Sequence, residues 1–402
     1  MSDAAFVKSL MLALPLAFLA GRMLPARLPL AVRLPVGLLV GWLVALAVTL
    51  VVPAGLMAYL VSFAVVGSIY AVIALGLNVQ WGYTGLFNIG IAAFFAVGAF
   101  TTALVTTTQP TGVAAGFTQQ AFGLGAPFLV GVLAAGLAAG VLALVVGGPT
   151  LRLRDDYLAI ATIGIAELVR LVFQNERWLA NGPQPLRGIP QPLACIVRDS
   201  GCAWLPAPLA SLFEPLASRD YTYVYMLITA LFVIVTFLVL ERAIRSPWGR
   251  LLRAVREEED AAAMNGKDVA RVKLQAFVVG AVIMGIGGAL YAHYMVSIDY
   301  SHFDPLYATF LIWVMLMLGG SGNNRGAILG AFVIWGVWTG TAFVVDAIRP
   351  ALAALSPELP ARGPYLRLMF IAFVLLFILL FRPKGLIGEE RFVSRHSEDR
   401  GR

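Results

Sequence analysis

Long apolar runs divide the chain, and each is about as long as a helix that crosses a bilayer. Such a helix needs roughly 20 apolar residues to span a hydrocarbon core about 30 Å thick. We therefore expect an all-α fold, a polytopic integral membrane helical bundle of about 10 or 11 transmembrane helices. The pattern predicts helices over residues 7–24, 34–52, 54–78, 86–107, 125–148, 158–175, 221–241, 274–296, 305–319, 326–346 and 364–381.

Glycines and amides interrupt two of these apolar regions, LNVQWGYTGLFNIGIAAFF (Leu77 to Phe95) and LGGSGNNRGAILGAF (Leu318 to Phe332). Glycine-broken segments in comparable positions of two halves point to a transport pathway, although small residues also let membrane helices pack closely. For GVLAAGLAAGVLALVVGG (131–148) packing is the better interpretation. In the two broken segments the amides need partners in lipid, which favours a pathway. The predicted pathway residues are Gly82, Gly85, Asn88, Gly90, Gly320, Gly322 and Asn323.

Composition supports the membrane assignment. The 402 residues are 60% hydrophobic and 13% charged, against about 25% charged residues in an ordinary soluble domain. Residues 34–151 contain no Asp, Glu, Lys, Arg or His. A soluble fold could not avoid exposing so long an uncharged stretch to water, whereas a bilayer accommodates it directly.

Basic residues gather in a few connecting segments and predict the orientation of the helices, because cytoplasmic loops are enriched in Lys and Arg. Residues 242–273 and the tail after Phe381 hold the two densest groups of Lys and Arg, 14 of the 29 in the chain, so both should be cytoplasmic. Counting spans backwards then places 176–220 and the uncharged loop 108–123 outside. The same count puts the N-terminus outside if all eleven helices cross the membrane.

The long outside loop holds both cysteines, Cys195 and Cys202, in the string CIVRDSGC. A small disulfide hairpin and two unpaired thiols both fit this spacing, and the oxidising compartment favours the disulfide. Nothing in the loop suggests a metal site.

The cytoplasmic segment Ser246–Phe277 has a helical pattern of its own. Ser246-Pro247 predicts a helix start and Asn265-Gly266 a helix stop. Between them one face is apolar, comprising Leu251, Leu252, Val255 and Ala262. This short amphipathic helix is either an interfacial loop that follows the charge rule or a docking helix for a cytoplasmic subunit.

Motifs for covalent chemistry are missing from the sequence. There is no phosphate-binding G-x-x-x-x-G-K-[ST], so ATP hydrolysis would have to occur on another chain. His293 and His302 lie near Asp299 and Asp304, where a wet interfacial loop is favoured over a metal or proton site. His396 lies far from both in the sequence.

Glu167 and Arg170 are the ionisable pair of a predicted span. They are three residues apart, so they share a helix face and can pair. Ionisable groups inside a bilayer are functional candidates by default, but a pair near a helix end can also be structural. Between these two roles we expect an internal ion pair that faces the bundle.

Four strings together resemble a known family, the membrane permease subunits of bacterial branched-chain amino acid ABC importers of the LivM type. They are LRLRDDYLAIATIGIAELVR (151–170), LLRAVREEEDAAAMNGKDVARVKLQAF (251–277), LMLGGSGNNRGAILGAF (316–332) and FRPKGLIG (381–388). The likeness runs from about residue 60 to 390, with the strings in the family's order. Two departures are Asp260, where the general ABC pattern has Glu, and the proline-rich NGPQPLRGIP (181–190).

The resemblance implies a division of the chain and a set of partners. Residues 1–53 would be variable N-terminal helices, 54–390 the permease domain and 391–402 a cytoplasmic tail. The protein would be a multi-pass protein of a bacterial inner membrane. The partners implied are cytoplasmic ABC ATPase subunits, a second permease subunit of the LivH type and a periplasmic amino-acid-binding protein, besides membrane lipid and with no nucleic acid or cofactor. The ATPase-coupling residues implied are Arg256, Glu259, Asp260, Ala261, Ala262 and Gly266.

The expected function is a non-enzymatic transport subunit for branched-chain or related neutral amino acids, driven by ATP hydrolysis on a partner. A wholly neutral central region suits a neutral or zwitterionic solute. Urea and short amides, which the family also carries, remain an alternative. An ion-coupled transporter or channel is a weaker one, because it needs carboxylates along its pathway and only Glu167 qualifies.

Overall fold

The computed structural model describes residues 3–23, 30–111, 118–198, 216–356, 362–381 and 385–389. Each of the eleven predicted apolar helices is present in it. They are α1 (Asp3–Met23), α2 (Leu30–Val51), α3 (Ala54–Leu77), α4 (Ile91–Thr106), α5 (Phe128–Thr150), α6 (Asp155–Asn175), α10 (Tyr221–Arg245), α13 (Val269–Met295), α14 (Pro305–Gly319), α15 (Asn324–Leu355) and α16 (Gly363–Phe381).

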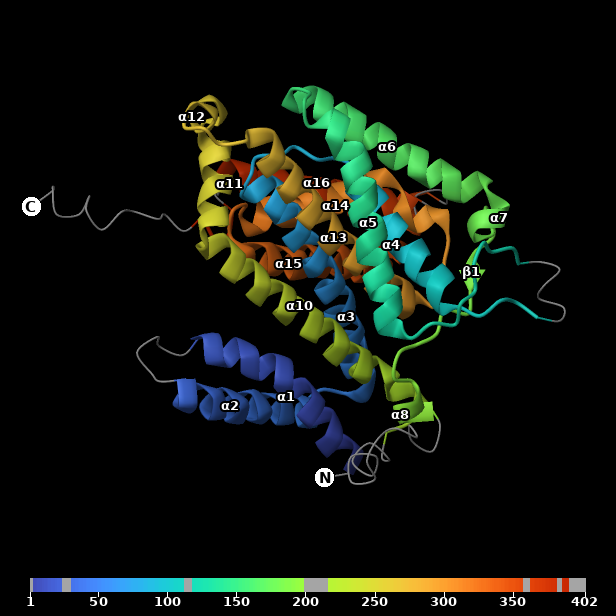
Figure 1. Cartoon of the computed structure of the whole chain (residues 1–402). Coiled ribbons are helices and arrows are strands. Elements are labelled where there is room, and N and C mark those ends of the chain that lie inside the picture. Colours follow the sequence, from blue (N-terminus) through green and yellow to red (C-terminus); the bar gives the residue numbers. More distant parts are fainter. Residues whose placement is uncertain are drawn as a thin grey trace, which may run out of the picture.

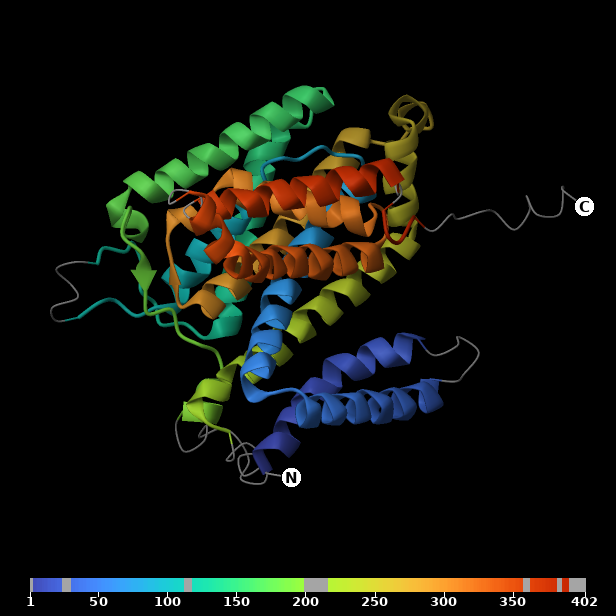
Figure 2. The same ribbon diagram turned by 180° about the vertical axis from the view of Figure 1, so that it is seen from behind.

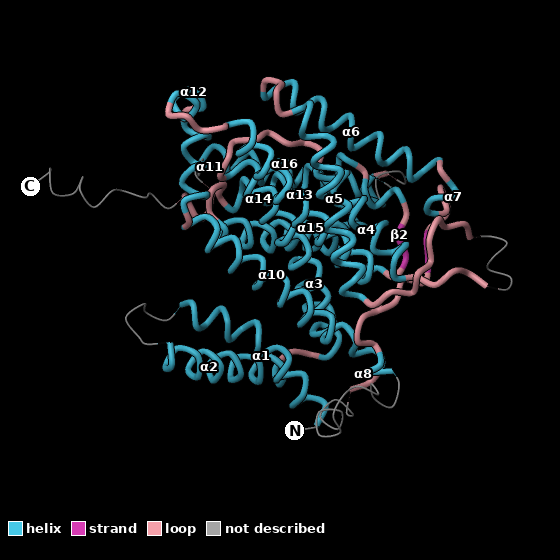
Figure 3. The backbone as a smooth tube through the Cα atoms, in the orientation of Figure 1, coloured by secondary structure: helices cyan, strands magenta, loops and turns pink. Residues whose placement is uncertain are grey.

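Short elements occupy the segments between these helices. A π-helical turn, η1 (Asn78–Gly82), follows α3, and 3₁₀ turns η3 (Ser218–Asp220) and η4 (Tyr300–Phe303) precede α10 and α14. The remaining ones are α7 (Arg177–Ala180), α8 (Cys195–Arg198), α11 (Pro247–Glu257) and α12 (Glu259–Met264). Strands β1 (Leu186–Arg187) and β2 (Ser297–Ile298) pair antiparallel, and Figure 3 shows that helices joined by loops make up most of the rest.

Helix α13 lies at the centre of the bundle, against α3, α4 and α5 (Figure 1). On the other side of α3 lie α10 and α15, and α15 also packs against α14 and α16, which Figure 2 shows from behind. The segments α11 and α12 lie at one end of the bundle, while β1, α7 and α8 lie toward the opposite end. This arrangement agrees with the predicted separation of a charged cytoplasmic segment from an outside loop.

The N-terminal helices α1 and α2 form a hairpin that stands beside the bundle and contacts it through α10 (Figure 1). An ion pair holds this contact, because Lys8 Nζ lies 2.8 Å from Asp220 Oδ1, and Asp220 is buried. The Lys8 ammonium also lies over the ring of Tyr223, 5.5 Å from its centroid. The hairpin therefore contacts the bundle near the start of α10, while Leu231, Val235 and Val239 farther along α10 remain exposed.

Small residues allow the central helices to approach closely. On α5 the buried positions include Gly131, Ala135, Ala139 and Ala143, which repeat every four residues and lie on one face. A Cβ atom built on Gly136 or Gly140 would contact Val282 of α13. Packing is therefore confirmed as the role of the glycine- and alanine-rich run 131–148.

The bundle has the composition of a multi-pass membrane protein. Among the described residues, five helical stretches are long and apolar enough to cross a membrane: Ala54–Gly82, Phe128–Thr150, Tyr221–Arg245, Val269–Met295 and Asn324–Pro350. Shorter apolar helices lie over Ala5–Ala17, Leu38–Val51, Ile91–Thr106 and Tyr307–Gly319. These helices confirm the expected all-α membrane bundle. Helices suit a bilayer because their backbone groups form hydrogen bonds within the same segment.

His293 and His302 serve the fold in different ways. His293 is fully buried, with Nε2 3.1 Å from Thr102 Oγ1 and Nδ1 2.7 Å from the carbonyl oxygen of Pro190. His302 lies in the capping turn of η4, where Asp299 accepts a hydrogen bond from the backbone N–H of Ser301 at 2.8 Å. Among the described residues no cluster of three His, Cys, Asp or Glu could hold a metal ion. His396 lies outside the described residues.

Candidate functional site

The two glycine-broken segments, which lie far apart in the sequence, meet in space. The first comprises residues 78–90 and the second residues 319–326. Asn78 Nδ2 donates a hydrogen bond of 3.0 Å to Asn324 Oδ1, and the backbone N–H of Gly322 donates one of 2.9 Å to Asn78 Oδ1. A Cβ atom on Gly82 would lie only 2.5 Å from the backbone nitrogen of Gly322. Glycine at position 82 is therefore required for this close approach.

Positive φ angles explain other glycines of both segments. Gly85 has φ +78°, Gly320 φ +109° and Gly322 φ +80°, a region that residues with a Cβ rarely adopt. Helix α4 consequently begins at Ile91 and not at the predicted residue 86, because the chain from Tyr83 to Gly90 is irregular. The breaks in the helices are confirmed.

The buried amides of the first segment bond to the protein itself. Gln80 Nε2 donates a hydrogen bond of 2.8 Å to the carbonyl oxygen of Phe277 in α13, and Asn88 Nδ2 donates one of 2.7 Å to Gln80 Oε1. Asn88 Oδ1 in turn accepts from the backbone N–H of Gly90 at 2.7 Å. Trp313 Nε1 of α14 donates 3.0 Å to the Asn88 carbonyl. The amides thus fasten the segment to α13 and α14 in this conformation, and a solute contact of Asn88 stays a prediction.

The amphipathic segment that we predict to be cytoplasmic forms two helices where the sequence predicts one. Ser246 caps α11 by accepting a hydrogen bond from the Trp248 N–H, as predicted. The chain then turns at Glu258, which has φ −155° and ψ 99°, before α12 begins. The predicted apolar face is present, because Leu252, Val255 and Ala262 are buried and Leu251 is partly buried.

The predicted coupling residues are placed mainly on α12. Asp260 and Ala261 are exposed, Ala262 packs inward, and Glu259 forms an ion pair with Lys273 of α13. Gly266 ends the segment with φ +71°, and no atom lies within 4 Å of a Cβ built there. The conformation and not the space therefore requires glycine at position 266.

Arg256 joins α11 to the broken segments. Its Nη1 donates a short hydrogen bond to the carbonyl oxygen of Gly82, and its Nη2 lies 2.7 Å from Glu389 Oε1. The aliphatic part of Arg256 also covers Gly85, where a Cβ would lie 3.1 Å from Arg256 Cγ. One guanidinium on α11 therefore holds the first broken segment directly.

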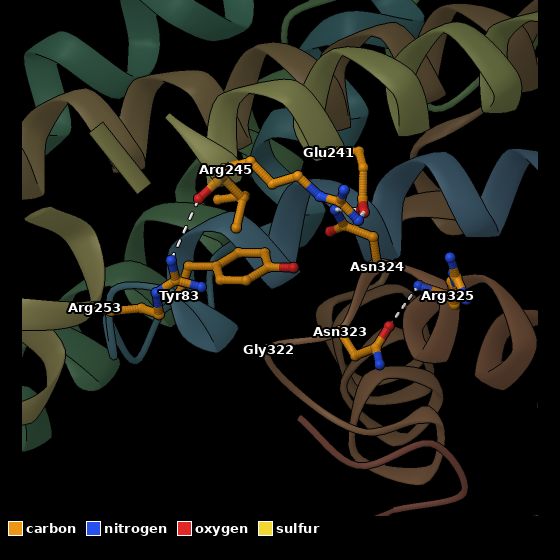
Figure 4. Close-up of a pocket in the computed structure, with 9 residues that line it drawn as sticks. Tyr83, Glu241, Arg245, Arg253, Gly322, Asn323, Asn324 and Arg325 are labelled. Carbon is orange, nitrogen blue, oxygen red and sulfur yellow. Dashed lines mark hydrogen bonds and ion pairs between the residues drawn. The ribbon is translucent and has the colours of Figure 1, made fainter. Parts of the chain in front are cut away.

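A polar pocket lies beside this junction, shown in Figure 4. The ring of Tyr83 projects into it between Arg253 of α11 and the polar groups of Glu241 and Asn324. Glu241 Oε1 forms an ion pair of 2.5 Å with Arg245. The pocket thus places the end of α10, Arg253 in the middle of α11 and the second broken segment around Tyr83.

Glu167 and Arg170 of α6 form the expected ion pair, but at the edge of the chain. Arg170 Nε donates 2.9 Å to Glu167 Oε2, and its guanidinium carbon lies 5.8 Å from the ring centroid of Tyr300. The side chains of Glu167 and Arg170 are 42% and 19% exposed. Helix α6 lies on the outside of the single chain (Figure 2), with Arg170 packed on Tyr300 of η4, and the expectation of an internal pair that faces the bundle stays a prediction.

Other predicted site residues lie as follows. Gly90 packs against α6, since a Cβ there would be 2.7 Å from the Thr162 carbonyl, and Asn323 Nδ2 donates 3.0 Å to the Gly388 carbonyl. Cys195 of α8 takes part in a disulfide bond. Cys202 and the tail 391–402 lie outside the described residues, so the pairing with Cys202 stays a prediction.

Sequence reasoning missed several residues of the junction: Asn78, Gln80, Trp313, Asn324 and Glu389. Asn78 and Gln80 carry a visible signal, because they are amides within an apolar run. No sequence pattern pointed to Glu389, because acidic and basic residues are common throughout the charged C-terminal stretch in which it lies.

Comparisons with known proteins agree with this architecture. The family model described as "Branched-chain amino acid transport system / permease component" matches residues 59–379. The high-affinity branched-chain amino acid transport system permease protein LivM of Escherichia coli (strain K12) is 29% identical over 337 residues, covering 82% of this chain and 70% of the relative. The probable branched-chain amino acid transport permease protein LivM of Methanocaldococcus jannaschii is 27% identical over 352 residues, covering 81% of this chain and 92% of the relative.

None of the solved structures matches this chain. The family match nevertheless begins within α3, ends within α16 and includes both broken segments, α11 and α12. On this evidence the chain belongs to the family of permease components of branched-chain amino acid transport systems.

Proposed function

We propose that this chain is the permease subunit of an ABC importer in a bacterial inner membrane, and that it translocates branched-chain or related neutral amino acids. Cytoplasmic ATPase subunits dock on α12 and drive the change in access. A binding protein delivers the solute from outside. The chain itself provides a gated path and a coupling segment, with no covalent chemistry.

One observation carries this proposal, namely the contact of the α11–α12 segment with the broken helices. Arg256 of α11 holds the carbonyl of Gly82, and Gly82 packs against Gly322. A displacement of the cytoplasmic helices is therefore transmitted to both segments that interrupt the membrane helices.

The proposed solute is neutral because the buried polar groups near the broken segments are mostly amides and hydroxyls. Asn78, Gln80, Thr84 and Asn88 are all buried, and α3 and α4 carry no charged side chain. Both LivM relatives are named for branched-chain amino acid transport. A zwitterion with an apolar side chain suits these surroundings better than an ion does.

A second permease subunit is proposed to cover α6. Its outward residues are largely apolar, including Ile160, Leu168 and Val172. The Glu167 side chain is 42% exposed on this helix, paired with the less exposed Arg170. Placing one charge at the centre of a lipid-facing helix costs about 2.5–3.5 kcal/mol on insertion scales. A related membrane subunit against this face would shield the ion pair from lipid.

Uptake is expected to depend on ATP hydrolysis by the partner. The chain would be reconstituted in lipid vesicles with the other subunits of its transport system, and the uptake of radiolabelled leucine measured. Inactive ATPase subunits should reduce uptake to background, because the permease has no phosphate-binding loop. Uptake that persists with inactive ATPase subunits contradicts the proposal. Excess unlabelled isoleucine or valine should compete, whereas competition by urea alone would indicate an amide transporter.

The role of Asn88 can be separated by Asn88→Leu. The substitution leaves Gln80 Oε1 and the Gly90 N–H without their partners, and each buried unsatisfied group costs about 1–3 kcal/mol. We therefore expect a marked loss of thermal stability in detergent. A variant that melts like the wild type but shows a raised KM for leucine would instead assign Asn88 to the solute pathway.

A further inference from the structure

The short segment that follows α16, Gly385–Glu389, is bound to the second broken segment. The backbone N–H of Leu386 donates a hydrogen bond of 2.8 Å to the Leu318 carbonyl oxygen, and that of Ile387 donates one of 3.0 Å to the Gly319 carbonyl oxygen. Asn323 Nδ2 donates 3.0 Å to the carbonyl of Gly388. These contacts fix the segment against the end of α14 and the start of α15.

Close approach of two backbones makes this contact specific. Gly385 has φ +74°, and a Cβ there would lie 2.6 Å from both the nitrogen and the Cα of Gly320. In the second broken segment, a Cβ on Gly322 would lie 3.0 Å from Glu389 Cδ. The segment therefore covers the second broken segment along its length and ends with Glu389 above Gly322.

Glu389 connects this segment to the cytoplasmic helices. Its Oε1 accepts from Arg256 Nη2 at 2.7 Å, while Nη1 of the same guanidinium donates to Gly82. The Arg256 and Glu389 side chains are 23% and 36% exposed. A pair this exposed contributes little to folding stability, but a charge-assisted hydrogen bond fixes geometry well.

We propose that Glu389 is a positioning residue for transport, which ties the C-terminal segment Gly385–Glu389 to Arg256, so that α11 moves both broken segments together. Arg256 reaches the first segment through the Gly82 carbonyl and the second through Glu389 and the backbone contacts of Leu386 and Ile387. Without Glu389, α11 would still hold the first segment, but it would reach the second only indirectly, through the contacts of Asn78 and Gly82 with Gly322 and Asn324. The inference rests on the proposed function for its link to ATP hydrolysis.

The test uses Glu389→Gln and Glu389→Lys in the full chain, reconstituted with its ATPase and permease partners. The number of leucine molecules taken up per ATP hydrolysed should fall by about threefold to tenfold in Glu389→Gln and further in Glu389→Lys, since the lysine repels Arg256. The ATPase subunits should co-purify in wild-type amount, and the melting temperature should stay near that of the wild type. Glu389→Asp, which keeps the charge, should recover part of the ratio. Asp346→Asn at the far end of α15 serves as the matched control.

A second measurement needs no solute. Hydrogen exchange of the backbone amides in residues 78–90 and 318–326 is followed before and after ATP binds the assembled complex. In the wild type both regions should change together, whereas in Glu389→Gln the change should remain in 78–90 and diminish in 318–326. If wild-type vesicles move no amino acid while this pattern appears, the proposed substrate fails and the role of Glu389 stands.

Three results would overturn the inference. The first is a wild-type transport ratio in both Glu389→Gln and Glu389→Lys. The second is loss of bound ATPase subunits, which would make Glu389 part of the docking surface. The third is an unchanged exchange response of residues 318–326 in both variants.

Discussion

Asp260→Lys is expected to abolish ATP-driven uptake while the protein remains folded in the membrane. Asp260 lies exposed on α12, so the change removes no buried contact. The substitution replaces a negative charge on α12 by a positive one. A proposed docking surface that is complementary to Asp260 would then face a charge of its own sign, and a like-charge contact across an interface costs several kcal/mol. A loss of about 2 kcal/mol or more weakens docking more than tenfold. Co-purification of the ATPase subunits and uptake of labelled leucine would both report the loss.

The matched control for this substitution is Asp346→Lys, which makes the same charge change at an exposed position near the other end of the bundle. It should leave co-purification and uptake at wild-type values. If Asp260→Lys retains both bound ATPase and uptake, α12 is not the docking helix. The ion pair of Glu259 with Lys273 would then serve only to hold α12 on α13.

Gly98→Leu is expected to prevent the chain from folding. Gly98 of α4 faces Gly285 of α13, and a Cβ there would lie 2.2 Å from the Gly285 carbonyl oxygen and 2.5 Å from its Cα. Both obstructing atoms are backbone, so α4 would have to separate from the central helix. Overpacking of a core costs typically 1–3 kcal/mol, and forced separation of two backbones should exceed about 3 kcal/mol, a large part of a usual folding free energy. The yield of monodisperse protein by size-exclusion chromatography measures the effect.

Gly148→Leu provides the control for this prediction. It introduces the same side chain on α5 at an exposed glycine, where no atom lies within 4 Å of the new Cβ. Its yield and melting temperature should match those of the wild type. Equal yields of the two variants would show that α4 and α13 do not pack as closely as described.

Much of the local structure could be predicted from the sequence. Each apolar run became a helix because lipid offers no hydrogen bonds and a helix satisfies its own backbone. The caps of the cytoplasmic segment were also visible, since Ser246-Pro247 and Asn265-Gly266 act within a few residues. The start of α4 was predicted too early because apolar residues continue through the irregular chain after η1.

The candidate site was only partly predictable. The sequence indicated that two segments were broken by glycines, but gave no means of learning that they meet, since Asn78 and Asn324 are 246 residues apart. The side on which Glu167 and Arg170 lie was also hidden. Helix periodicity places the two on one face of α6, and the neighbours of that face are decided by packing.

The sequence by itself determined the class of protein, the helices and the charged amphipathic segment between α10 and α13, because hydropathy, capping and charge act locally along the chain. It also carried the family resemblance that the comparisons confirmed. Only the tertiary structure decided that Arg256, Gly82, Gly322 and Glu389 form one junction. Contacts between distant segments depend on which helix faces meet, and short-range patterns do not encode that pairing.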